Sequence, residues 1–244
     1  MQTNNTENQN DMDFLKAQNK ITIIDIPEQV RKADKAEEAK KAERERINKH
    51  IIFYQFTKRR VYTTALKAYL MYLACNICYA LIFNRKSENS TNQEEIEDQF
   101  KKPLSDSVLA YYIIVICILG PLIEEFIFRS FIFKLINWVG KKVQKKVKVI
   151  GIIIRILAFL ISSFLFAFSH FSFSFEILTK EIRTFPSYFL MGLFFAYAYN
   201  RDGYILASVF THMLNNVIAT LCIYCINYTA IDYEILSFIR EINF

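Results

Sequence analysis

Residues 120–129 read GPLIEEFIFR and place three ionisable side chains inside an otherwise apolar stretch. Residues 107–123 contain no charged side chain, and apolar sequence resumes directly after the stretch. A charge at bilayer depth costs about 2.5–3.5 kcal/mol on insertion scales. Glu124, Glu125 and Arg129 are therefore expected to find polar partners elsewhere in a bundle of membrane helices.

The composition favours a protein that crosses the membrane several times. Hydrophobic residues make up 53% of the 244 residues, and only five Gly and four Pro interrupt them. The apolar residues cluster in runs that approach or exceed the roughly 20 residues of a spanning helix. We therefore predict an all-α membrane helix bundle of about five to six spans. The apolar runs cover residues 61–83, 108–139, 150–171, 185–199 and 204–226.

The segments between these runs are also informative. The run 108–139 is too long for one perpendicular span, and the Gly-Pro pair inside it is expected to break or kink the helix. The acidic segment 84–103 is predicted to be an outer loop, and residues 200–203 a tight turn. The tail 227–244 alternates apolar and charged residues, which favours an interfacial helix.

Residues 1–60 precede the first apolar run and are predicted to form an arm, with residues 61–244 as the membrane domain. The first 20 residues lack the apolar core of a signal peptide and favour disorder. Residues 28–49 are rich in Ala, Glu, Lys and Arg and favour a solvated helix. The lysine-rich loop 141–148 and the basic arm are expected on the cytoplasmic side. Since basic residues flank apolar runs, no nucleic-acid partner is expected.

Two further polar clusters interrupt apolar runs. FAFSH ends at His170, and THMLNN at residues 211–216 contains His212 and Asn216. His212 and Asn216 lie four residues apart, so they share one helix face. Either histidine alone is as well explained by an interhelical hydrogen bond. The co-occurrence of carboxylate, imidazole and amide groups in three apolar segments is what favours a functional site.

Helical spacing separates the two adjacent glutamates. Glu125 and Arg129 lie four residues apart and can form an ion pair. Such a pair can be purely structural. Glu124 points about 100° away from Glu125 around the helix axis. It has no cation on its own helix, so it is the better candidate for chemistry.

These groups are compatible with more than one mechanism. A carboxylate and an imidazole can activate water, and an imidazole with an amide can stabilise an oxyanion. Glu124, His170 and His212 are also ordinary ligands of Zn²⁺. The Cys-x-x-Cys pairs at 75–78 and 222–225 offer a rival metal or redox site, although cysteine in an apolar helix is mostly a small buried hydrophobe.

The three clusters together resemble the signature motifs of the CPBP intramembrane proteases. Glu-Glu-x-x-x-Arg occupies residues 124–129, Phe-x-x-x-His residues 166–170, and His-x-x-x-Asn residues 212–216. The similar region covers about residues 105–226. The family includes the type II CAAX prenyl endopeptidases and bacterial Abi proteins linked to bacteriocin processing and self-immunity.

The resemblance implies an intramembrane endopeptidase, metal-dependent or metal-free, that acts on a peptide or protein substrate among membrane lipids. The implied roles are water activation by Glu124 and His170, oxyanion stabilisation by His212 and Asn216, support by Glu125 and Arg129, and optional Zn²⁺ binding by Glu124, His170 and His212. A bacterial cell membrane is the expected location. The alternatives are a non-catalytic bacteriocin self-immunity or scaffolding protein, and a small transporter that uses the same groups as a proton relay.

Overall fold

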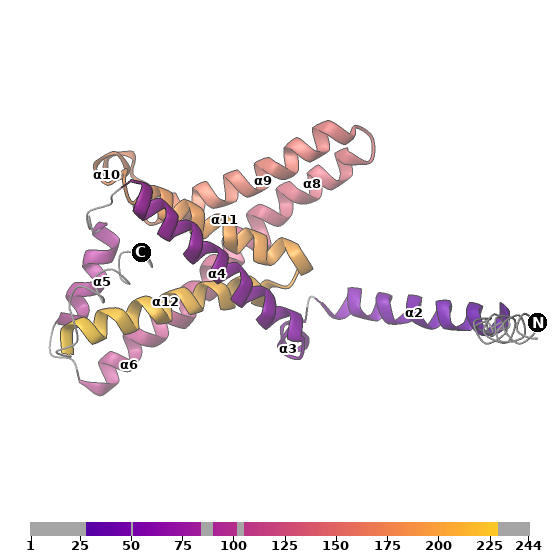
Figure 1. Cartoon of the computed structure of the whole chain (residues 1–244), viewed down its shortest axis with the longest axis horizontal. Helices are drawn as coiled ribbons and strands as arrows, with labels where there is room; N and C mark the ends of the chain where they lie inside the picture. Colours follow the sequence, from indigo (N-terminus) through magenta and orange to yellow (C-terminus); the bar gives the residue numbers. More distant parts are fainter. Residues whose placement is uncertain (1–27, 50, 84–89, 102–104, 229–244) are drawn as a thin grey trace, which may run out of the picture. The chain divides into compact units, whose positions relative to one another are not determined.

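A computed structural model describes residues 28–49, 51–83, 90–101 and 105–228. The predictions for residues 1–20 and for most of the tail lie outside this part of the chain. Its elements are helical, and it contains no strand, which confirms the all-α fold class. The helices are α2 (Glu28–Asn48), α3 (Ile52–Phe56), α4 (Arg59–Ile82), α5 (Thr91–Lys101), α6 (Asp106–Ile114), α7 (Gly120–Glu125), α8 (Lys134–Gln144), α9 (Lys148–Ser169), α10 (Phe175–Lys180), α11 (Phe185–Asp202) and α12 (Ile205–Tyr228), with π-helical segments η1 (Val115–Leu119) and η2 (Phe126–Phe133) (Figure 1).

Two compact units divide the chain between Ile47 and Asn48. In the first unit, α2 is the solvated helix predicted from its composition. In the second unit, α3 packs on α4 and α12. The Gln55 side chain of α3 is buried and accepts a hydrogen bond from the backbone N–H of Leu206 (2.9 Å). The short α3 is thus part of the membrane unit.

Four helical stretches in the described residues are long and apolar enough to cross a membrane. They are α4, the continuous stretch Asp106–Gln144, α9 and Ile205–Tyr224 of α12. Many of their large apolar side chains are exposed, as expected for surfaces that face lipid. The chain is therefore an integral membrane protein.

The predicted span at residues 185–199 forms the helix α11. α11 is not among the four candidates that are long and apolar enough in the described residues. Its last turn carries Asn200, Arg201 and Asp202, which lower its mean hydropathy. Its inner face packs on α4, α9 and α12. The predicted membrane helix bundle is therefore confirmed, with four spanning candidates in the described residues beside the approximate count of five to six from the sequence.

The Gly-Pro pair was expected to break or kink the long helix, and it does not break it. The backbone continues from Asp106 to Gln144 through η1 and η2, which flank α7. At the end of η1, the Gly120 N–H donates to the carbonyl of Val115, five residues back. Pro121 follows without an N–H to donate. The wider π turn accommodates the proline without breaking the helix.

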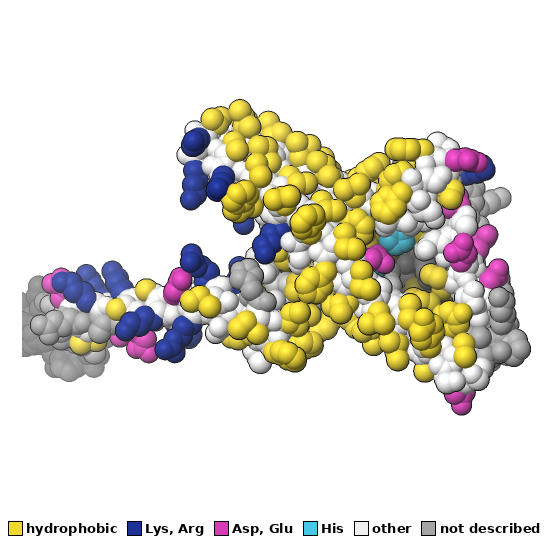
Figure 2. Space-filling view, turned by 180° about the vertical axis from the view of Figure 1, so that it is seen from behind, with side chains coloured by type: hydrophobic (Ala, Val, Ile, Leu, Met, Phe, Trp, Pro, Cys, Tyr) yellow, Lys and Arg dark blue, Asp and Glu magenta, His cyan; other side chains and the backbone are white. Residues whose placement is uncertain are grey.

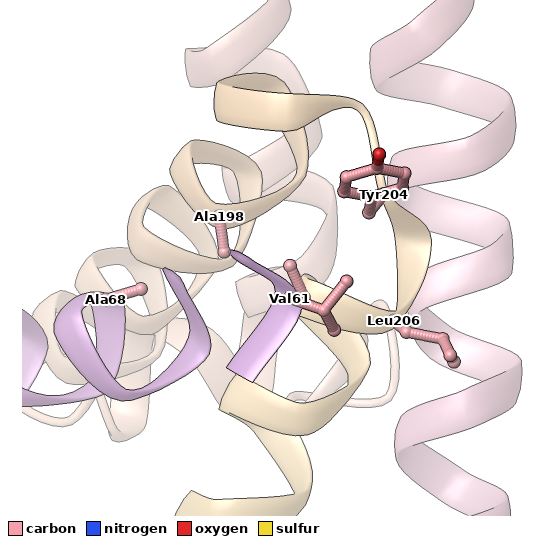
Figure 3. Close-up of a cluster of buried hydrophobic side chains, with 6 residues drawn as sticks. Val61, Ala68, Ala198, Tyr204 and Leu206 are labelled. Atoms are coloured by element: carbon pink, nitrogen blue, oxygen red, sulfur yellow. The ribbon is translucent and has the colours of Figure 1, made fainter. Parts of the chain in front are cut away.

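The segment between the first two spans is not simply a loop. Within the predicted outer loop 84–103, residues Thr91–Lys101 form α5, which packs on α12. The predicted tight turn at 200–203 is confirmed, because α11 ends at Asp202 and Gly203 adopts a left-handed φ of 72°. Beside this turn, Figure 3 shows Val61 of α4 close to Ala198 of α11 and Leu206 of α12.

Helices α8 and α9 form an antiparallel hairpin and lie side by side (Figure 1). Gly151 of α9 is buried, and a Cβ there would overlap the backbone N and Cα of Gln144. The same close approach occurs where α9 crosses α11, because a Cβ on Gly192 would lie 2.9 Å from the Cα of Ser163. Small residues at helix crossings are typical of membrane bundles.

Replacing Gly151 with Ala should destabilise the protein, because the added methyl group overlaps backbone that cannot move aside. Overpacking of this kind costs about 1–3 kcal/mol. Thermal unfolding of the purified protein in detergent should therefore begin at a lower temperature. The matched control is Ile153→Ala on the same helix, whose side chain is half exposed on the lipid-facing surface. An unchanged midpoint for Gly151→Ala would contradict the close packing of α8 and α9.

Candidate active site

Glu125 and Arg129 form a fully buried ion pair. Both side chains have no exposed surface, and Nε of Arg129 lies 3.1 Å from Oε2 of Glu125. The four-residue spacing predicts this pair, and η2 keeps the two groups on one face. The second contact of the guanidinium is Nη2, which donates to the carbonyl of Gly192 in α11 (3.0 Å). The pair therefore connects the long helix to α11.

Aromatic rings surround the guanidinium of Arg129. Its Cζ lies 4.6 Å from the ring centroid of Phe166 and 5.6 Å from that of Phe195. A cation over an aromatic face is stabilised by the ring quadrupole, more strongly away from water. Phe166 is the first residue of the Phe-x-x-x-His motif, so its ring contributes to holding the charge. This gives the motif phenylalanine a physical reason to be aromatic.

Glu125 also holds His212. Its Oε1 lies 3.2 Å from Nδ1 of His212, and the Ser208 hydroxyl hydrogen-bonds its Oε2. The His212 ring stacks on Phe195 with a centroid distance of 4.6 Å. Because a carboxylate only accepts, Nδ1 of His212 carries the hydrogen. Sequence reasoning missed Ser208, although it lies four residues before His212 and thus shares its face of α12.

His170 follows the last residue of α9 and is half-buried. Its Nδ1 lies 2.9 Å from the carbonyl oxygen of Phe166. Its ring stacks on Tyr188 with a centroid distance of 4.4 Å, and the Tyr188 hydroxyl lies 2.8 Å from Oγ of Ser90. A carbonyl only accepts, so Nδ1–H donates and Nε2 of a neutral ring has the lone pair. Tyr188 was not predicted, because no motif marks this contact between α9 and α11.

Glu124 has a different environment from Glu125. Its Oε2 is buried and has no hydrogen-bond partner, and no ion pair involves this side chain within the described residues. An unsatisfied carboxylate oxygen is costly away from water. In a native site, such an atom indicates a group that is completed by water, an ion or a substrate.

Glu124 lines a cavity of about 230 Å³. The walls come from the long helix, from α5, α11 and α12, and from the end of α9. The cavity brings together all four residues predicted to be catalytic, which are Glu124, His170, His212 and Asn216. Figure 2 shows a histidine and an acidic side chain close together in an opening among hydrophobic side chains. Asn92 of α5, which sequence reasoning did not single out, also lines the cavity.

Asn216 has a structural partner that the sequence did not predict. Its Nδ2 donates to the carbonyl of Ile116 in η1 (2.9 Å). That carbonyl would pair with the Gly120 N–H in an α-helix, but Gly120 donates to Val115 instead, and Pro121 has no N–H. Asn216 therefore satisfies a carbonyl that the π turn leaves open. Its amide has a second hydrogen that can point into the cavity.

The cavity also contains the three candidate zinc ligands, Glu124, His170 and His212. Within the described ranges, however, no group of three or more His, Cys, Asp or Glu side chains is placed to hold a metal ion. The same holds for the cysteines whose side chains are described. Cys75 and Cys78 are exposed, and Cys222 is buried.

Loss of the charge should affect the stability of the protein very differently at the two glutamates. Glu125→Gln leaves the buried Arg129 without its anion, and breaking such a pair costs about 3–5 kcal/mol. Glu124→Gln removes a charge that forms no ion pair in the described residues, so it should change stability far less. Thermal unfolding in detergent measures both. Equal destabilisation by the two variants would contradict this division between a structural and a free carboxylate.

Comparison with known proteins supports the motif assignment. Residues 106–218 match the family described as Rce1-like, type II CAAX prenyl endopeptidase Rce1-like. This region contains all three motifs and lies within the predicted core of about 105–226. No curated protein and no solved structure matches the chain. The family match confirms the resemblance to the CPBP proteases, and residues 106–218 carry the Rce1-like sequence pattern of that group.

Proposed function

We propose that this protein is an intramembrane endopeptidase of the CPBP type that hydrolyses a peptide bond with water activated by Glu124 and His170. The observation that carries the proposal is the unpartnered Oε2 of Glu124 in a cavity shared with two histidines and an asparagine. The Rce1-like match supports a protease of the CAAX type. A non-catalytic membrane protein has no need to keep a carboxylate without an ion pair in a helix that crosses the membrane.

In the proposed reaction, a water molecule binds between Glu124 and His170. Nε2 of neutral His170 accepts a hydrogen bond from the water and orients it. Glu124 takes the other proton as the water oxygen attacks the carbonyl carbon of the substrate. The resulting tetrahedral intermediate collapses with cleavage of the C–N bond. Glu124 then gives its proton to the departing amine nitrogen, which leaves the carboxylate ready for another cycle.

His212 and the second amide hydrogen of Asn216 are proposed to stabilise the oxyanion. Glu125 accepts from Nδ1 of His212, so a protonated ring would donate from Nε2 to the developing negative charge. The hydrogen bond from Asn216 to Ile116 holds the amide in place before the reaction. Pre-organised donors of this kind cost little reorganisation when the charge appears.

A second hollow supports approach of an apolar substrate. It has a volume of about 500 Å³ and shares Asn92, Glu124 and His170 with the cavity. Its remaining walls are mainly apolar side chains of η2 and α9 and Phe173. A membrane-embedded peptide, with or without a prenyl group, can lie there with its scissile bond next to Glu124. We further propose that the N-terminus and the lysine-rich residues 141–148, where α8 turns into α9, face the cytoplasm of a bacterial cell. Bacteriocin processing is one proposed role for such an enzyme.

The test is to trap the substrate and then cleave it. A Glu124→Ala variant carrying a photo-crosslinker near the cavity should retain its substrate in its own cells. The captured protein, reconstituted in liposomes, should be cleaved by the wild type. Glu124→Gln, His170→Ala and His212→Ala should each lower the rate by about 10²–10⁴-fold, the usual contribution of a positioned acid or base.

The matched control is Glu176→Gln, which removes a carboxylate from the exposed pair with Lys180 and should not alter the rate. Cleavage that survives all three active-site substitutions would contradict the proposal and favour a scaffolding role. Incubation with a chelator in the same assay tests metal dependence. A loss of activity that Zn²⁺ restores would assign Glu124 and the histidines as ligands, rather than the metal-free mechanism described above.

A further inference from the structure

A second polar pocket lies away from the candidate active site, between α8 and the turn that joins α11 to α12. Its volume is about 210 Å³. Three lysines border it, two from α8 and one from the segment before α3, with two asparagines and three aromatic rings. The lining residues are Lys49, Phe133, Lys134, Asn137, Trp138, Lys141, Tyr199, Asn200 and Gly203.

The charge of this pocket is positive and not compensated. No carboxylate lines it. In the described part of the chain, no ion pair involves Lys49, Lys134 or Lys141. The nearest acidic residue in sequence is Asp202, whose carboxylate accepts a hydrogen bond from Thr64 (3.1 Å). Converging ammonium groups repel one another, and a bound anion relieves that repulsion.

The wall behind the lysines is polar and fixed. Asn137 is buried, and its Nδ2 donates to Oδ1 of Asn200 (3.3 Å). Its Oδ1 accepts from Nε of the half-buried Arg155 (3.2 Å). Arg155 is held by neutral amides, since Nη1 donates to Oε1 of Gln144 (3.0 Å). The guanidinium of Arg155 therefore lies behind the pocket as a fourth cation and adds to its positive potential.

Lys49 lies directly against the turn at Gly203. A Cβ at Gly203 would lie 2.8 Å from Nζ of Lys49, so the ammonium group packs closely on this glycine. The backbone of Lys49 is fixed, because its carbonyl accepts from Nε2 of Gln55 (2.7 Å). The turn and α3 together place this lysine over the pocket.

A partly apolar hollow adjoins the basic pocket. It measures about 250 Å³ and shares Lys134, Tyr199 and Gly203 with the basic pocket. Its other walls are the apolar side chains of Ile52, Phe126 and Ile205 and the polar side chains of Gln55 and Ser130. The combination suits an amphipathic ligand with a negatively charged head and a hydrocarbon chain. Basic pockets between membrane helices are suited to phosphate-bearing headgroups.

We propose that this basic pocket binds the phosphate headgroup of an anionic phospholipid, with an acyl chain along the apolar side of the adjoining hollow, formed by Ile52, Phe126 and Ile205. Lys49, Lys134 and Lys141 contact the phosphate, and Asn137 and Asn200 form the polar floor. The proposal is independent of the protease assignment, because none of these residues lines the candidate active site. It places a lipid against α8 and against the start of α12, the helix that carries His212.

Trp138 provides a direct reporter, because it lines the pocket and is the only tryptophan in the chain. The full-length protein is reconstituted in phosphatidylcholine vesicles that contain a small fraction of brominated phosphatidylglycerol. Bromine quenches tryptophan fluorescence at short range. Quenching should saturate at a lower mole fraction than with brominated phosphatidylcholine.

Two double variants with equal charge loss separate the pocket from general surface charge. Lys49→Gln with Lys141→Gln should raise the half-saturating fraction of the anionic lipid roughly tenfold or more, given the usual contribution of each lysine near an anionic headgroup. Lys145→Gln with Lys146→Gln removes two exposed lysines that follow α8 and lie outside the pocket, and this double variant should change the half-saturating fraction less than about twofold.

Equal quenching by both brominated lipids would overturn the proposal, and so would an equal effect of the two double variants. A third arm adds inorganic phosphate at constant ionic strength. Retained quenching identifies the lipid as the source of the phosphate. Loss of the excess quenching in phosphate, but not in chloride, would overturn the lipid and assign the pocket to a soluble phosphate compound.

Discussion

The buried Glu125–Arg129 pair is the constraint on which the structure of the site depends. Both groups are fully buried in a helix that crosses the membrane, so neither is tolerated without compensation. Compensation comes from other elements: the Gly192 carbonyl of α11, and the Ser208 hydroxyl and His212 ring of α12. Satisfying one ion pair thus fixes three helices against one another and sets the orientation of a catalytic candidate.

Adjacent glutamates have opposite environments because a helix turns about 100° per residue. Glu125 faces the packed interior, and both of its oxygens contact partners. Glu124 faces the cavity, and its Oε2 has no hydrogen-bond partner. The π turn beside them also has two consequences for the site. It accommodates Pro121 within the helix and leaves the Ile116 carbonyl to hold Asn216 at the cavity wall. Backbone irregularity and side-chain placement are therefore linked at this point.

Local spacing in the sequence was enough to predict much of this arrangement. It predicted the pairing of Glu125 with Arg129 and the helices that carry the three motifs. It could not reveal the stacking of His170 on Tyr188 or the link from Glu125 to His212, because these contacts join residues far apart in the chain. At residues 185–199 the apolar pattern predicted a helix, which the structure contains as α11. The packing of α11 against α4, α9 and α12 joins residues far apart in the chain, and hydropathy does not report it.

The central claim is that water reaches Glu124 and not its neighbour Glu125. Carboxyl footprinting tests it directly on the unmodified protein in nanodiscs, with a water-soluble carbodiimide, a small amine and mass spectrometry to locate the product. The exposed Glu176 serves as the positive reference. The account predicts modification of Glu124 and protection of Glu125. Protection of both, or preferential modification of Glu125, would contradict it.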